Sequence, residues 1–374
     1  MEEEEYSFEE ETHNEKNNEE EEEEEEIEEE EKIEEEDIEG EILDENTLIP
    51  NLGILDSPND MEYAYTKLVM NDSGIKDASI LSNYSHLRFI SLSSNLLRKA
   101  TFLSDMTDAV YIDLHNNDIK FLPEFPKPIS NLLTINLNGN RIRSLPVLPF
   151  PLLTKLDLSD NRIKTISPNA FSGIPNLQTL KLSSNNLRKL ESTMFSGLFN
   201  LKRLYLNSNH IKFIQNETFK DLNSLRKLNL SENSIKKLSS FDCELLNLQE
   251  LNLSVNNIQT IKDLEILNDK DKYENLKQLN VDGNPLMQNE EEPWLNIVYN
   301  FKQLEYLNED EVTKEEREEA EEYIKEKIAE EEERKRIEEE RRREEEEEER
   351  ERRRAEEEEE RERKREEEEE EDEN

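Results

Sequence analysis

The sequence predicts an α/β solenoid in which about ten stacked units form one parallel β-sheet on a concave face. Three observations predict this fold class. An apolar pattern repeats through the middle of the chain, an asparagine recurs at one position of the pattern, and most of the acidic charge lies in the two ends of the chain. Because one short unit cannot bury its apolar face alone, such units stack in a line and stabilise each other.

The repeated pattern is L-x-x-L-x-L-x-x-N, and residues 153–161 and 177–185 carry its clearest copies. Its first eight asparagines follow one another at a short and nearly constant interval, which is typical of leucine-rich repeats. Each copy predicts a short strand with buried leucines. We expect the asparagine amides to form a ladder of hydrogen bonds to backbone groups of the turns, each residue worth roughly 1–3 kcal/mol. The positions are Asn95, Asn117, Asn140, Asn161, Asn185, Asn209, Asn233, Asn256 and Asn284.

The connections on the outer side differ along the chain. Phe171, Phe195 and Phe219 recur at equal spacing in similar contexts, and Phe241 follows them. They are predicted to stack inside the convex side. Residues 122–151 contain six prolines, which predicts extended rather than helical connections there.

Charge and apolar content divide the chain into five predicted segments. The whole chain has a net charge of -47, and residues 1–45 alone hold 28 acidic and 2 basic side chains. Such a segment buries too little apolar area to offset its chain entropy, so we expect it to be disordered. The segments are an acidic disordered tail and lead-in (1–59), a degenerate N-terminal cap repeat (60–86), the leucine-rich repeats (87–284), a C-terminal cap (285–308) and a charged helix (309–374).

The C-terminal segment is predicted to form a single exposed helix from about residue 311 to 365. Glutamates precede arginine or lysine by four positions in many places, as in Glu349 and Arg353, and each such pair stabilises a helix by about 0.2–0.5 kcal/mol. No apolar heptad is sustained, which argues against a stable coiled coil. A solvated tail with fraying helicity is the alternative.

The sequence predicts no enzyme and no cofactor or metal site. The four histidines lack metal-ligand spacing, and no phosphate-binding glycine motif occurs. The acidic balance argues against a nucleic-acid partner, and no apolar run is long enough for a membrane. The single cysteine, Cys243, and the glutamate-rich start, which does not look like a signal peptide, predict a cytoplasmic or nuclear protein, and the cytoplasm is favoured. Other proteins are the expected partners, rather than small molecules.

Two candidate binding surfaces follow from the repeat register. Residues on either side of the central buried residue of each strand should point outward on the concave face, where aromatic side chains and arginine favour protein recognition. Arg203 and Tyr205 are the predicted central contact, and a catalytic Asp113–His115 pair is a weaker alternative to a binding patch. The concave candidates are Tyr111, Asp113, His115, Lys155, Lys181, Arg203, Tyr205 and Lys227.

The second candidate is a row of basic residues, three positions after each asparagine in seven successive repeats. We call this row the basic edge; it comprises Arg98, Lys120, Arg143, Lys164, Arg188, Lys212 and Lys236. It could bind an acidic partner or the acidic tail of the same chain, or it could simply reflect an exposed position.

The sequences on either side of the repeats indicate which leucine-rich-repeat family the chain resembles. Glu-Tyr-Ala-Tyr-Thr-Lys-Leu at 62–68 and the stretch 80–92 resemble the N-terminal cap of the leucine-rich-repeat radial spoke proteins of motile cilia and sperm flagella. Those proteins also begin with a glutamate-rich segment. Residues 304–317 are similar to an end cap shared by several axonemal and intracellular repeat proteins. The chain departs from the family in its phenylalanine-type repeats at 161–241 and in its longer Glu/Arg helix.

The resemblance implies a structural subunit of the ciliary axoneme that stabilises a radial spoke through protein contacts. Two other classes remain open. One is a regulator, either of a phosphatase or of the acidic nuclear histone-binding type; the 18 basic residues of the C-terminal segment argue against the nuclear type. The other is a subunit of a dynein-regulatory complex.

Overall fold

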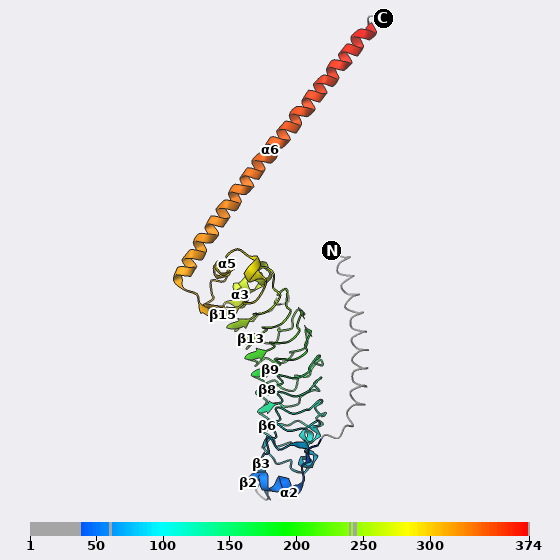
Figure 1. Cartoon of the computed structure of the whole chain (residues 1–374), viewed down its shortest axis with the longest axis vertical. Helices are drawn as coiled ribbons and strands as arrows, with labels where there is room; N and C mark the ends of the chain where they lie inside the picture. The colour runs from blue at the N-terminus through cyan, green and yellow to red at the C-terminus, as the bar shows by residue number, and fades with distance from the viewer. Residues whose placement is uncertain (1–38, 60–61, 239–240, 242–244, 373–374) are drawn as a thin grey trace.

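The computed structural model describes residues 39–59, 62–238, 241 and 245–372. Its repeats stack into a slender arc, and one long helix projects from the C-terminal end (Figure 1). A single sheet of 13 strands runs along the arc in the order β17-β16-β15-β14-β13-β11-β9-β8-β7-β6-β5-β3-β2. The predicted solenoid with its long parallel sheet is therefore confirmed.

Most strands are three residues long, because each repeat contributes to the sheet only the three residues centred on the second apolar position of its pattern before it turns. In each of these strands the central residue is buried, as Leu180 and Leu204 are. The parallel strands are β3 (Glu62–Val69), β5 (Phe89–Ser91), β6 (Tyr111–Asp113), β7 (Thr134–Asn136), β8 (Lys155–Asp157), β9 (Thr179–Lys181), β11 (Arg203–Tyr205), β13 (Lys227–Asn229), β14 (Glu250–Asn252), β15 (Gln278–Asn280) and β16 (Tyr306–Leu307).

The folded region begins before residue 60, where the sequence placed its boundary. β2 (Leu52–Asn59) pairs antiparallel with β3, and β1 (Glu41–Ile42) pairs with β4 (Ile75–Asp77). The short helices α2 (Glu45–Leu48) and η1 (Ile49–Asn51) lie between them. Leu43 and Leu48 are buried against the first repeat, so this lead-in closes the apolar end that the degenerate repeat leaves exposed. The disorder predicted for residues 1–45 is therefore wrong for 41–45, which form β1 and the start of α2, while residues 1–38 lie outside the described residues.

The predicted asparagine ladder is confirmed. The side chain of Asn185 is almost fully buried and bonds its own repeat to the preceding one: its Oδ1 accepts from Ile163 N at 2.9 Å, and its Nδ2 donates to Leu158 O at 2.9 Å and Leu182 O at 3.2 Å. Each asparagine therefore supplies partners to backbone groups that water does not reach. The ladder ends at Asn284, since Asn308 aligns with Asn280 and accepts from Val281 N at 2.8 Å in place of a backbone carbonyl.

The residue before each ladder asparagine has a left-handed backbone conformation. Ser, Asn, Asp, Glu or Gly fills this position in most repeats, but Val255 has a φ of 53° there. A β-branched side chain is strained by about 1–2 kcal/mol in this region of φ/ψ space. Asn116 adopts the same conformation at the corresponding position, with a φ of 54°.

We expect Val255→Asn to raise the free energy of unfolding by about 1 kcal/mol, because asparagine tolerates the left-handed conformation. Val255 is 54% exposed, so little burial is lost. Urea unfolding of the variant and of the reciprocal change Asn116→Val measures the effect. The reciprocal change should destabilise the chain, and a gain or no change there would contradict the explanation.

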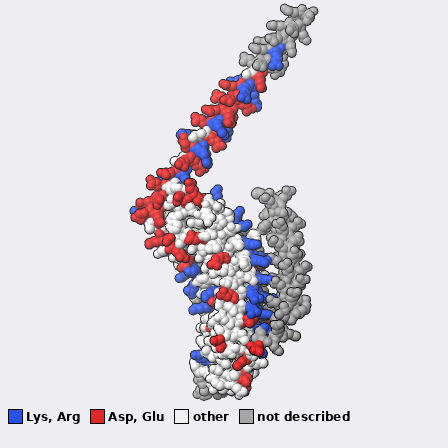
Figure 2. Space-filling view, in the orientation of Figure 1, with Lys and Arg blue, Asp and Glu red and all other residues white. Residues whose placement is uncertain are grey.

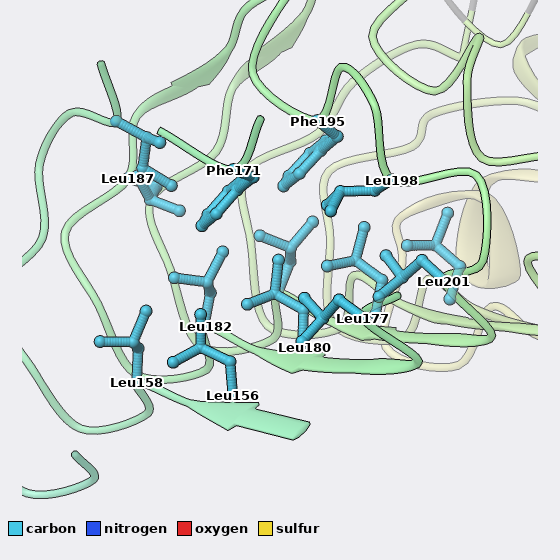
Figure 3. Packing of buried hydrophobic residues seen from close by; sticks show 14 of the residues in the cluster. Leu156, Leu158, Phe171, Leu177, Leu180, Leu182, Leu187, Phe195, Leu198 and Leu201 are labelled. Atoms are coloured by element: carbon cyan, nitrogen blue, oxygen red, sulfur yellow. The ribbon is translucent and has the colours of Figure 1, made fainter. Parts of the chain in front are cut away.

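The outer side contains the predicted phenylalanine stack. Phe171, Phe195 and Phe219 are buried, with successive ring centroids 6.3 and 6.2 Å apart and rings nearly parallel; Phe241 follows at 5.2 Å with a tilted ring. Figure 3 shows Phe171 and Phe195 lying over the leucines of the strands. Residues 122–151 form no helix, as their prolines predict. Elsewhere the outer segments are η2 (Ser79–Asn83), η3 (Thr101–Asp105), β10 (Lys189–Leu190), β12 (Phe213–Ile214), η4 (Ile261–Asn268) and α3 (Lys270–Tyr273).

The C-terminal end of the solenoid is closed by α4 (Leu286–Asn289), α5 (Pro293–Asn300) and β17 (Asp310–Glu311), followed by the projecting helix α6 (Lys314–Asp372). α6 begins with a capping box, in which Thr313 and Glu316 bond each other's backbone N–H groups. Its first turns are docked: Arg317 donates to the carbonyl oxygens of Lys302 and Leu304, and Ala320 is fully buried. The predicted charged helix is confirmed, including the Glu349–Arg353 pair at 2.9 Å.

Candidate functional site

Two columns of side chains run along the strand face, one on each side of the buried central residues. The pairing of the strands is in register from β3 to β15, so each column is continuous. The first column is Lys67, Phe89, Tyr111, Thr134, Lys155, Thr179, Arg203, Lys227, Glu250 and Gln278. The second is Val69, Ser91, Asp113, Asn136, Asp157, Lys181, Tyr205, Asn229, Asn252 and Asn280. All but one of the predicted concave residues belong to these columns, and the remaining one, His115, lies two residues beyond Asp113.

An aromatic cluster occupies the N-terminal part of the first column. The rings of Phe89 and Tyr111 stack with centroids 4.4 Å apart and an interplanar angle of 8°, and the ammonium group of Lys67 lies 5.5 Å from the Phe89 centroid. Phe89 remains 38% exposed. The cluster is thus a pre-ordered, partly apolar surface that a partner can cover with little loss of side-chain entropy.

Hydrogen bonds hold Tyr111, Asp113 and His115 together. Asp113 is buried, its Oδ1 lies 2.7 Å from His115 Nδ1, and its Oδ2 accepts from the Tyr111 hydroxyl at 3.3 Å. Burial raises the pKa of the Tyr111 phenol, and the charge of Asp113 and its hydrogen bond raise it further. The carboxylate therefore fixes the orientation of both neighbouring rings, and the phenol keeps its proton at neutral pH.

In the central patch predicted around Arg203 and Tyr205, the charged side chains already form contacts with other residues of the chain. Arg203 Nε donates to Thr179 Oγ1 at 3.1 Å, the Lys181 ammonium is 2.7 Å from Asp157, and the Lys227 ammonium is 2.5 Å from Glu250. These groups are partly exposed, so each ion pair contributes little to stability. A partner that uses the cations here has to compete with existing contacts, whereas the aromatic cluster offers an uncommitted apolar surface.

The sequence predicted the central contact at Arg203 and Tyr205 and placed Phe89 on the same face, but it did not predict the cluster that Phe89 and Lys67 form with Tyr111. Phe89 lies one repeat before Tyr111 in the same column, so its stacking was readable from the register. Lys67 lies in the degenerate cap, as far before Phe89 in the sequence as Phe89 lies before Tyr111. Extending the repeat spacing into the degenerate cap would therefore have predicted that Lys67 belongs to this column.

The basic edge lies where the chain has left the sheet, beyond the asparagine turn. Figure 2 shows Lys and Arg side chains gathered along one edge of the solenoid. None of its seven residues is buried. In the described part of the chain, no group of three His, Cys, Asp or Glu side chains is arranged to hold a metal ion. Among the same residues, no helix has the length and apolar character that crossing a bilayer requires.

Comparisons with known proteins agree with this architecture. Residues 151–211 and 199–258 match the leucine-rich repeat family model. The solenoid is similar to the solved complex of TLR13 with ssRNA13, at a TM-score of 0.51 and 24% identity over 65% of this chain and 36% of that one. This likeness concerns the fold alone. No curated protein matches the chain.

Two bacterial structures are similar at lower scores. One is a leucine-rich-repeat protein of Leptospira interrogans, with a TM-score of 0.46 and 22% identity over 62% of this chain and 63% of that one. The other is the functional domain of InlJ from Listeria monocytogenes, which includes a cysteine ladder, with a TM-score of 0.45 and 21% identity over 67% and 55%. The chain spans less than two thirds of each of the three solved chains. Residues 151–258 thus match leucine-rich repeats, and the 13-stranded sheet extends the same solenoid architecture to both sides of them.

Proposed function

We propose that the protein is a non-catalytic scaffold that binds another protein across its strand face, as a structural subunit of the ciliary axoneme. The observation that carries the binding role is the aromatic cluster: stacked rings of Phe89 and Tyr111, held by Lys67 and Asp113, on a continuous in-register surface. Rigid, exposed aromatic groups beside charged ones are the commonest energetic anchors of protein interfaces. The axonemal assignment, to a radial spoke, rests on the resemblance of residues 62–92 and 304–317 to those proteins.

The docked helix α6 supports a scaffolding role. Lys327 forms an ion pair with Glu291 at 3.0 Å and lies 4.9 Å from the Tyr323 centroid, so the first turns of α6 are held on the cap. The rest of the helix extends into solvent (Figure 1). A protein bound to the strand face and one bound to α6 would be held at separate, defined places.

We expect Phe89→Ala combined with Tyr111→Ala to weaken partner binding by about 30-fold or more, because two anchors worth about 2 kcal/mol or more together are removed. The measurement is the axonemal fraction of a tagged full-length chain in motile ciliated cells, which should fall sharply. The matched control is Phe121→Ala with Phe199→Ala, since these phenylalanines are 53% and 51% exposed away from the strand face. The control should enter the axoneme normally.

Absence of the unmodified chain from cilia, with accumulation in the nucleus, would contradict the axonemal assignment and favour the regulatory class. Equal loss from the axoneme in the control variant would instead contradict the role of the strand face.

A further inference from the structure

The basic edge is a continuous row rather than a set of scattered charges. Neighbouring members are joined through their backbones: Arg143 N donates to Lys120 O at 3.4 Å, Lys164 N to Arg143 O at 3.4 Å, and Lys212 N to Arg188 O at 2.9 Å. Adjacent rungs of such a ladder are about 4.8 Å apart. The row therefore presents one positive charge per repeat along a single line.

The row begins one repeat earlier than the sequence pattern showed. Ser73 N and Ile75 N both donate to Asn95 Oδ1 at 3.0 Å, which places this segment as the rung before Arg98. Lys76 then occupies the position of Arg98 in the degenerate repeat. Eight successive rungs are basic, from Lys76 to Lys236. Lys99, Arg141, Arg162, Lys189 and Lys237 lie next to members of the row in the sequence, and of these Arg141 and Lys189 are ion-paired with Asp118 and Glu191.

Solvent exposure alone does not explain why every residue of this row is positively charged. The first column of the strand face is at least partly exposed in seven of the same eight repeats, yet only four of its eight residues there are basic, and the others are phenylalanine, tyrosine and two threonines. Residues 46–308 hold 29 acidic and 28 basic side chains, so the solenoid has no general excess of positive charge. Asp118, beside the row, is itself paired with Arg141 at 2.8 Å. Positive charge is thus segregated to this edge.

The acidic N-terminal segment joins the solenoid at the first rung of this row. Glu41 N donates to Gly74 O at 2.9 Å, and β1 lies parallel to β4, which contains Lys76. A Cβ built on Gly40 would lie 3.2 Å from Lys76 Cβ, so the chain passes directly against that rung. Residues 1–38 contain 24 acidic and two basic side chains. Eight rungs span about 35 Å, and 38 residues exceed this length even as a helix of about 57 Å.

We propose that residues 1–38 bind the basic edge of their own molecule and so restrict its access to other acidic polypeptides. The complementarity of charge, the attachment point at the first rung and the length of the segment all favour this occupant. The tether gives the segment an effective concentration of about 1 mM, so a free acidic peptide with a Kd of about 50 µM would bind the intact chain about 20-fold more weakly. The proposal is independent of the function proposed for the strand face.

The test uses the full-length chain and a fluorescent synthetic peptide of residues 1–38 as the probe. In the releasing variant, the 12 glutamates at 19–26 and 28–31 are replaced by glutamine, which removes most of the charge of the tethered segment. A second variant adds Arg143→Gln, Lys164→Gln, Arg188→Gln and Lys212→Gln. Its matched control instead adds Lys155→Gln, Lys181→Gln, Arg203→Gln and Lys227→Gln, the same charge change on the strand face. Circular dichroism verifies that all variants are folded.

The releasing variant should bind the peptide about 20-fold more tightly than the unmodified chain, in low salt. Neutralising the basic edge should weaken this binding at least tenfold, while the strand-face control should stay within about twofold, and 0.5 M salt should abolish the difference. Equal binding by the unmodified chain and the releasing variant would overturn the proposal. So would equal losses in the two neutralised variants, or tighter binding of an RNA oligonucleotide than of the peptide.

Discussion

Replacing Phe195 by alanine should lower the free energy of unfolding by about 3–5 kcal/mol. The Phe195 ring is fully buried and stacks on both Phe171 and Phe219. Its removal leaves a cavity between repeats that pack through this side chain and the leucines below it (Figure 3). Because stability in a solenoid is a sum of contacts between neighbours, the loss falls on two interfaces at once.

Urea unfolding followed by circular dichroism and by Trp294 fluorescence measures this loss. The matched control is Phe199→Ala, four residues away, where the side chain is 51% exposed and the change should stay within about 0.5 kcal/mol. Phe195→Leu should fall between the two. A loss at Phe195 no larger than the loss at Phe199 would show that the outer stack is not a determinant of stability.

Asn185→Ala should destabilise the chain by about 2–3 kcal/mol, although it deletes only a small polar side chain. The amide satisfies the N–H of Ile163 and the carbonyl oxygens of Leu158 and Leu182, all in the interior. Alanine would leave the buried Ile163 N–H without a partner, and the two carbonyl oxygens would each lose one of two donors, since Leu158 O also accepts from Asn161 Nδ2 and Leu182 O from Asn209 Nδ2. Asn185→Asp should be similarly damaging, because a carboxylate cannot donate to two carbonyl oxygens.

Asn176→Ala provides the comparison, since Asn176 donates a single exposed bond of 2.8 Å to Pro151 O. That bond can be replaced by water, so we expect a loss below about 1 kcal/mol. Similar losses at the two positions, measured by the same unfolding experiment, would contradict the explanation based on burial.

Features with a fixed period were predictable from the sequence. The spacing of Asn161, Asn185 and Asn209 located strands and turns, and the equal spacing of the phenylalanines located the outer stack, because every copy has to satisfy the same packing geometry. The degenerate ends were harder. Leu43 and Leu48 lie in a glutamate-rich stretch whose composition predicts disorder, yet they are buried because the first repeat offers them an apolar surface.

The candidate sites were predictable as positions but not as contacts. Strand alternation placed Tyr111, Lys181 and Arg203 on one face, since side-chain direction follows from the backbone alone. The pairing of Lys181 with Asp157, and the stacking of Phe89 on Tyr111, depend on side-chain rotamers and on which neighbouring rung offers a partner. These contacts form between residues that are a full repeat apart in the sequence. A local sequence pattern does not predict which of the possible partners a side chain contacts.

The docking of α6 on the cap has a consequence for how this chain can change in length. With its first turns fixed by Arg317 and Lys327, every residue inserted into or deleted from the helix moves its distal part by about 1.5 Å and also rotates it by about 100°. A binding site near the distal end would keep its phase only when the change is close to a whole number of turns, such as seven or eleven residues. The helix contains neither glycine nor proline that could absorb a mismatch. The length of the helix and the direction in which its distal side chains point are therefore coupled. A single-residue deletion would turn a distal binding site away from its partner, whereas a seven-residue deletion would leave the site facing almost the same direction.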